Sequence, residues 1–262
     1  GDVYKRQLHM GVAGAAWATV ISQGVSGVAC LIYMVKKFEV QRIRKEEWAM
    51  DGHMMLSLCG MGVPMGLQYS ITAIGSVILQ AAANTLGSAA VAAMTAGGRI
   101  VSFLACPYDA MGSTMATYGG QNVGAGKLER IGKGLKSCVI LGAVYSAMAL
   151  LLAVFFGDAL ATLFVEKDEL SIIGDVHKFL LLNTLFFFQL ALVNIIRFLI
   201  QGMGFPKFAI LAGVFEMVAR SAAGFGLVPF IGFTGVCLGS PFAWIMADIF
   251  LIPAYFHVSK TL

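Results

Sequence analysis

The stretch SCVILGAVYSAMALLLAVFFGDALATLF (Ser137–Phe164) decides the fold class of this chain. It carries a single charged side chain, Asp158, and it exceeds the roughly 20 residues that a helix needs to cross about 30 Å of hydrocarbon. A strand of a membrane barrel would instead alternate apolar and polar residues over about 10 positions. The stretch is therefore typical of a membrane-spanning helix.

Further segments of the chain share this length and apolar character. Hydropathy places them at Met10–Met34, Met55–Ala83, Ala89–Tyr118, Val176–Ile200, Phe208–Phe230 and Gly235–His257. Of the 262 residues, 58% are hydrophobic and 12% are charged, whereas a soluble domain has about 25% charged residues. The sequence therefore predicts an all-α integral membrane protein with seven transmembrane helices, and membrane lipid is the expected partner of its outer surface.

Lys and Arg are distributed unequally between the two sides of the predicted spans. One side holds eleven of them and the other holds two, Lys167 and Lys178. The eleven are Lys36, Lys37, Arg42, Arg44, Lys45, Lys127, Arg130, Lys133, Lys136, Lys207 and Lys260. Because cytoplasmic loops are enriched in Lys and Arg, we expect a multi-pass protein of the plasma (inner) membrane with a cytoplasmic C-terminus. The net charge of +4 then reflects membrane topology, and no nucleic-acid partner is expected.

Charge and an internal similarity divide the chain into four segments. Residues 1–7 are polar and lead into an apolar span without a cleavage-site pattern, so we interpret them as a non-native leader. The stretches GVAGAAW (Gly11–Trp17) and GFTGVCL (Gly232–Leu238) each carry two glycines three residues apart, which suggests corresponding helices of two repeats. We therefore assign residues 8–35 to the last helix of a preceding bundle and residues 55–262 to a six-helix bundle.

The segment between these two parts, residues 36–54, mixes charged residues with apolar ones. It is expected to be cytoplasmic. It forms either an amphipathic helix at the membrane surface or a solvated linker.

Several motifs resemble those of the multidrug and toxic compound extrusion (MATE) transporters. GVPMGLQYSITAIGSVILQAAANTLGSAAVAA (Gly62–Ala93) is similar to the family's seventh and early eighth helices, and GGQNVGAGKLER (Gly119–Arg130) to the cytoplasmic loop after the eighth. RFLIQGMGFPK (Arg197–Lys207) is similar to the loop after the tenth. The resemblance covers nearly the whole chain from Leu8 on. It implies twelve helices in two six-helix bundles, of which this chain would hold the sixth to the twelfth, with the first bundle as its partner.

Polar and ionisable residues inside the spans are the candidate functional residues, because such groups are costly in hydrocarbon. Glu216 and Arg220 lie one helical turn apart and form either a structural ion pair or a gate that faces a cavity. Arg99 and Asp109 lie about 15 Å apart along one helix and cannot pair with each other. Pro107 should bend this helix, so Asp109 belongs either to a rocking gate or to an interhelical salt bridge. The candidate cavity residues are Gln68, Thr72, Gln80, Arg99, Asp109, Asn194, Glu216 and Arg220.

Other residues receive more local roles. Arg197 lies near the cytoplasmic edge and can extend its side chain to the interface, and Asp248 is expected to anchor helix packing. The family-motif cytoplasmic loop contributes Gly120, Gln121, Asn122 and Gly124. Some MATE proteins carry a cation-binding carboxylate in the seventh helix, but Thr72 matches that position and cannot carry the charge. The coupling carboxylate would then lie in the preceding bundle.

The resemblance implies a multidrug efflux antiporter, present here as a fragment. It would export amphipathic, often cationic, drugs or toxins in exchange for Na⁺ or H⁺ by alternating access. The alternative is a lipid-linked oligosaccharide flippase of the same superfamily. Such a protein would need several cationic side chains in its cavity to bind a pyrophosphate, and the central candidates here are two, Arg99 and Arg220. The sequence contains no HExxH, no GxxxxGK[ST] and no zinc or haem spacing. An enzyme is therefore not expected, and the coupling ion takes the place of any cofactor.

Overall fold

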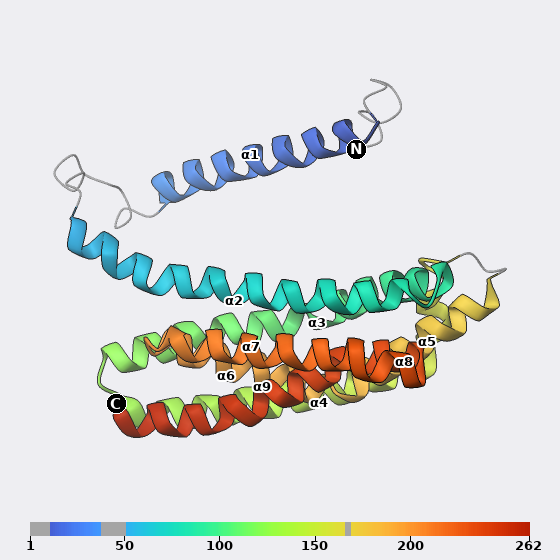
Figure 1. The fold of residues 1–262 in the computed structure, drawn as a ribbon. Coiled ribbons are helices and arrows are strands. Elements are labelled where there is room, and N and C mark those ends of the chain that lie inside the picture. The colour runs from blue at the N-terminus through green and yellow to red at the C-terminus, as the bar shows by residue number, and fades with distance from the viewer. Residues whose placement is uncertain (1–10, 38–50, 166–168) are drawn as a thin grey trace. The chain divides into compact units, whose positions relative to one another are not determined.

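The computed structural model describes residues 11–37, 51–165 and 169–262 (Figure 1). The predicted leader, residues 1–7, and most of the predicted linker lie outside the described residues. The chain forms two units, Gly1–Met55 and Leu56–Leu262. All regular secondary structure in the described residues is helical, as the sequence predicts.

The first unit contributes one helix, α1 (Gly11–Lys37). Its last turn carries Lys36 and Lys37. Positive charge is favourable there, because the C-terminal end of a helix is the negative end of its dipole. Large apolar side chains such as Trp17 and Tyr33 are more than half exposed along it. Together with its length and hydropathy over residues 16–37, this exposed apolar surface is that of a membrane-spanning helix.

The second unit contains the remaining helices, and α2 begins just before it. Their bounds are α2 (Gly52–Asn84), α3 (Ser88–Gly124), α4 (Leu128–Ala161), α5 (Leu170–Leu185), α6 (Phe187–Gly202), α7 (Pro206–Ala222), the π-helical turn η4 (Ala223–Leu227), α8 (Val228–Ile231) and α9 (Phe233–Thr261). Six helical segments of the described chain are long and apolar enough to span a membrane, and α5 with α6 forms a seventh span if the bent pair is counted as one. The predicted all-α membrane fold is confirmed.

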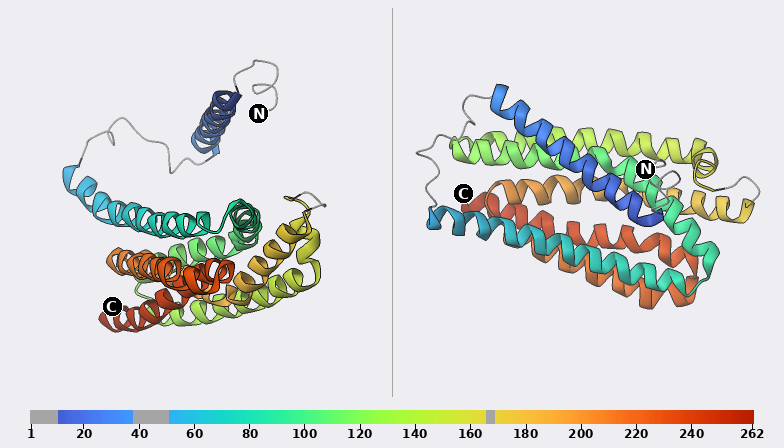
Figure 2. Two further views of the ribbon diagram at one scale, coloured as in Figure 1. Left: turned by 45° about the vertical axis from the view of Figure 1, so that its right-hand side comes forward. Right: turned by 90° about the horizontal axis from the view of Figure 1, so that it is seen from above.

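Successive spans of the second unit reverse direction. In Figure 1 the α3–α4 turn and the C-terminus lie at one end of this unit, while the α2–α3 turn and α8 lie at the other. Helices α3 and α4 leave their common turn side by side (Figure 2). Helix α4 begins at Leu128 rather than at Ser137, so the basic residues Arg130, Lys133 and Lys136 belong to a helix that continues beyond the apolar stretch. The end that carries these charges also carries Lys260.

Tight turns at this end depend on glycine. Gly126 and Gly204 have φ angles of 67° and 95°, a region that strains any residue with a Cβ. After α3, the amide of Gly126 donates to the carbonyl of Val123 and the amide of Lys127 to that of Asn122, at 3.0 and 2.9 Å. This pair of bonds is a Schellman cap, and Gly204 ends α6 in the same way.

The family-motif residues Gly120, Gln121, Asn122 and Gly124 were predicted to form a loop, and this prediction is wrong. They form the last turns of α3, which continues without interruption through Pro107 to Gly124. Helix α3 packs closely against α6 here, since a Cβ on Gly120 would lie 3.1 Å from the carbonyl oxygen of Gly202. The motif therefore supplies a small face for helix packing as well as the cap.

The predicted span Val176–Ile200 is two helices that are bent by 50° at Phe186. Neither proline nor glycine lies at the break. Instead, the ring of Phe187 is fully buried, with its centroid 5.6 Å from that of Tyr108 on α3 and 6.2 Å from that of Trp244 on α9. Aromatic packing in the core stabilises the break, so the sequence pattern alone could not reveal it.

Candidate functional site

Helices α6 and α7 bring together a buried group of charged side chains. Glu216 and Arg220 on α7 are 2% and 6% exposed, and Arg220 Nη1 lies 3.2 Å from Glu216 Oε2. The predicted one-turn ion pair is therefore present. Both members lie inside the bundle.

Arg197 on α6 completes the group. Its Nη2 donates to Glu216 Oε1, so each oxygen of this carboxylate accepts from a different guanidinium. Arg197 is 6% exposed, which corrects the prediction that it extends to the membrane interface. A buried guanidinium is costly without a counter-charge, and Glu216 lies on the neighbouring helix within reach.

Two amides extend this Arg–Glu–Arg group, and one of them, Gln201, lies one helical turn beyond Arg197 on α6. Gln201 Nε2 on α6 donates to Gln68 Oε1 on α2 at 2.9 Å, and Gln68 is 3% exposed. Thr72, one turn further along α2, has a buried hydroxyl oxygen without a partner in the described part of the chain. The amides thus join α2 to α6, as polar side chains commonly do between membrane helices.

Asp248 on α9 is the residue whose importance the sequence interpretation missed. It is 6% exposed, and no group in the described ranges donates a hydrogen bond to either of its carboxylate oxygens. It interacts electrostatically with Arg197 on the adjacent α6. The signal in the sequence was a lone carboxylate within an otherwise apolar span.

The remaining candidate residues do not join this cluster. Gln80 donates to Asn84 at 3.4 Å on the same helix. Asn194 is buried where α6 contacts α3. Its backbone carbonyl oxygen would lie 3.2 Å from a Cβ added to Gly112. Arg99 and Asp109 are exposed on α3, and neither forms an ion pair within the described residues. The proposed salt bridge of Asp109 is therefore not observed there.

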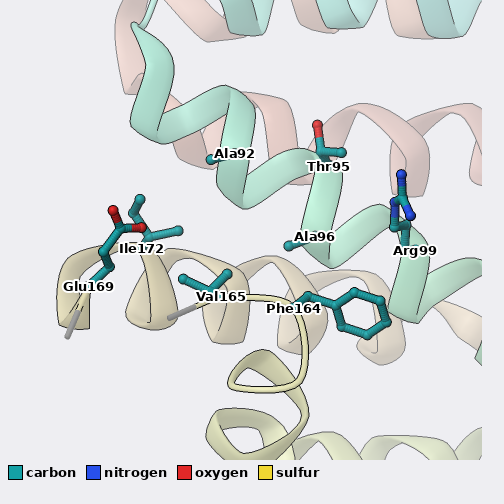
Figure 3. A pocket seen from close by; sticks show the side chains of 8 residues that line it. All are labelled: Ala92, Thr95, Ala96, Arg99, Phe164, Val165, Glu169 and Ile172. Atoms are coloured by element: carbon teal, nitrogen blue, oxygen red, sulfur yellow. The ribbon is translucent and has the colours of Figure 1, made fainter. Parts of the chain in front are cut away.

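A cavity of about 590 Å³ lies between α3 and the connection from α4 to α5. Figure 3 shows Arg99 and Glu169 at opposite ends of its lining. The other lining residues are mainly small or apolar, and they are Ala92, Thr95, Ala96, Phe164, Val165 and Ile172. The cavity therefore offers an apolar surface between one positive and one negative side chain.

Comparison with known proteins identifies the family. The sequence model of the MatE family matches residues 64–225, which is more than half of the chain. This chain belongs to the MatE family. The membership predicted from the motifs is thereby confirmed. MatE proteins are transporters rather than enzymes.

Two similar proteins come from Bacillus subtilis (strain 168). The probable multidrug resistance protein YpnP is 30% identical over 173 residues, which cover 64% of this chain and 38% of YpnP. The probable multidrug resistance protein YoeA is 22% identical over 177 residues, which cover 66% of this chain and 38% of YoeA. The chain thus spans less than half the length of these two MatE relatives.

A solved structure shares the MatE fold along nearly the whole chain. A MOP superfamily transporter from Pyrococcus furiosus matches with a TM-score of 0.87 at 19% identity. The match covers 99% of this chain and 59% of that transporter. At this identity the likeness establishes the fold and leaves the roles of individual residues to the geometry described above.

Proposed function

We propose that this MatE chain is the second half of a multidrug efflux antiporter. The whole transporter exports amphipathic, often cationic, compounds across the plasma membrane in exchange for Na⁺ or H⁺. Its basic end, with the α3–α4 turn and the C-terminus, faces the cytoplasm. The multidrug resistance names of the Bacillus relatives support this function.

One observation favours drug efflux over the transport of lipid-linked oligosaccharides. A flippase for such lipids needs several free cations to bind a pyrophosphate. Arg220, one of the two central candidates, is paired with Glu216 inside the bundle, and so is Arg197. Among the described residues, Arg99 is then the single arginine that lines the cavity between α3 and the α4–α5 connection, and Glu169 lies at the other end of this lining. The apolar lining can hold the apolar body of a compound, and Glu169 can pair with a positive group on it.

Transport requires that the bundle move relative to its partner. The close contact of α3 with α6 at Gly120 and Gly202 holds these helices together, so the second unit is suited to moving as one body. Binding of the coupling ion must favour one arrangement over the other, because otherwise the ion gradient cannot drive transport.

The test uses the full transporter, with the first bundle joined to this chain, in cells that lack their own efflux pumps. These cells should expel ethidium and fluoroquinolones faster than empty cells while an ion gradient exists. A protonophore and a Na⁺ ionophore, added separately, should show which gradient drives export. Equal accumulation in expressing and empty cells, across a panel of dyes and drugs, would refute the efflux assignment.

Charge variants of the cavity make the same test sharper. Glu169→Gln removes the negative charge, and an ion–ion interaction of this kind near a surface is worth about 1 kcal/mol or somewhat more. The apparent affinity for cationic ethidium should therefore fall about fivefold, while that for a neutral drug stays constant. Arg99→Gln should shift the affinity for ethidium in the opposite direction. Equal effects on cationic and neutral compounds would argue against this cavity as the substrate path.

A further inference from the structure

The carboxylate of Asp248 has surroundings that suit a neutral group better than an ion. It is 6% exposed on α9 and receives no hydrogen bond from the described parts of the chain. An ionised carboxylate buried without donors is so costly that such a group usually takes up a proton instead. By contrast, Glu216 nearby receives two guanidinium groups and fits its charged form.

The charged groups around Asp248 come from a few helices. On α6 there is Arg197, and on α7 there are Glu216 and Arg220. On α2, Tyr69 interacts electrostatically with Arg197.

Helix α5 also packs on α9, with its charged residues near the other end. Lys178 donates to Thr234, which is 248 − 234 = 14 residues before Asp248, or about 21 Å along the helix. Asp175 interacts with Cys237 in the same region. On α3, the exposed Arg99 and Asp109 and the buried Tyr108 have no interaction with Asp248 in the described structure, and η4 and α8 carry no titratable residue. On α9 itself, Tyr255 and His257 lie two turns or more beyond Asp248.

We propose that Asp248 is a proton-binding site of the transporter and that its proton decides which carboxylate Arg197 contacts. With the proton bound, Arg197 and Arg220 share Glu216, as in this structure, and Asp248 is neutral. When the proton leaves for water, Asp248 becomes negative and attracts Arg197 from α6 towards α9. Glu216 then keeps Arg220, so both guanidinium groups have a carboxylate in either state.

A proton fits this site better than a metal ion. A bound metal cation would need several oxygen ligands, and the described residues contain no group of three or more acidic, histidine or cysteine side chains that could hold one. A proton needs a single carboxylate oxygen.

The switch links protonation to helix packing. Arg197 contacts α7 through Glu216 in one state and α9 through Asp248 in the other, so the proton changes how α6 packs on its neighbours. This inference rests on the proposed antiport function for its physiological meaning. It assigns the coupling proton to this bundle, whereas the sequence placed the coupling carboxylate in the preceding one.

The experiment compares the full transporter with its Asp248→Asn and Asp175→Asn variants in proteoliposomes. The amide of Asp248→Asn imitates the protonated acid permanently, and Asp175 on α5 is a matched acid outside the cluster. Asp248→Asn should still bind ethidium and exchange it at equilibrium, but uptake driven by a pH gradient should fall at least tenfold, and binding should lose its dependence on pH. Asp175→Asn should behave as the unmodified protein. Undiminished pH-driven uptake in Asp248→Asn would overturn the proposal.

A second measurement does not depend on transport. Infrared difference spectra of the purified protein, recorded between low and high pH, should show the carbonyl band of a protonated carboxylic acid. All carboxyl groups that take up a proton contribute to this band, and the component that comes from Asp248 should be lost in Asp248→Asn and kept in Asp175→Asn. If the proposed efflux function fails, the band still tests the site. A spectrum that Asp248→Asn leaves unchanged would show that Asp248 binds no proton.

Discussion

Removing the carboxylate of Glu216 should destabilise the bundle severely. Glu216→Gln keeps the shape of the side chain but removes the carboxylate that Arg197 and Arg220, each 6% exposed, both contact. Breaking a buried ion pair by removing one partner typically costs about 3–5 kcal/mol. Because one carboxylate serves two guanidinium groups here, we expect the upper part of this range. At about 1.4 kcal/mol per decade, the folding equilibrium should shift by roughly three decades.

The measurement is denaturation of the chain in detergent, followed by tryptophan fluorescence, to which Trp244 in the core near Phe187 contributes. Glu129→Gln is a suitable control, because Glu129 is exposed in the first turn of α4. This change should alter the free energy of unfolding by less than about 0.5 kcal/mol.

A compensated variant separates two explanations of the loss. Replacing Arg197, Glu216 and Arg220 together by Met, Leu and Met removes all three charges, and such apolar replacement of a buried ionic group is often neutral or stabilising. The triple variant should therefore recover most of the stability that Glu216→Gln loses. If Glu216→Gln unfolds at the same denaturant concentration as the unmodified chain, the buried ion group has been misinterpreted. If it folds poorly but any surviving protein transports normally, Glu216 is structural rather than part of a gate.

Further predictions concern helix packing and topology. A Cβ at Gly202 would overlap the backbone of Ala116 on α3, so Gly202→Ala should force α3 and α6 apart and lower the free energy of unfolding by roughly 1–3 kcal/mol. Gly124 has open space around it, so Gly124→Ala should cost less than about 1 kcal/mol in the same unfolding assay. In a chain whose native cysteines have been replaced, a cysteine at Lys133 should react with an impermeant thiol reagent from the cytoplasmic side, and one at Glu169 from outside. Labelling of both positions from the same side would contradict the alternating topology.

Much of the fold could be read from the sequence because it depends on local composition. Each span is recognised by its own apolar length, and the reversal of direction follows from short turns that contain Gly126 and Gly204. The Glu216–Arg220 pair was also predictable, since residues four apart on a helix always lie on one side. The efflux function and the cytoplasmic end remain proposals, whereas membership of the MatE family is established.

The candidate site was only partly predictable. Gln68, Glu216 and Arg220 do meet in or near one buried cluster, whereas Arg99 lies at a separate cavity and Gln80 bonds within its own helix. No local pattern distinguishes a polar residue that faces the bundle from one that faces lipid or a second bundle. Hydropathy averages over the whole circumference of a helix and so loses this information.

The sequence by itself determined that this chain crosses a membrane repeatedly, because the cost of placing helices in lipid is set by each segment separately. Only the tertiary structure decided which buried charges have partners. Arg197 finds Glu216 nineteen residues away on another helix, while Asp248 finds no donor among the described residues. Whether a buried charge is stabilised depends on atoms a few ångströms away in space, and the packing of neighbouring helices determines which atoms those are.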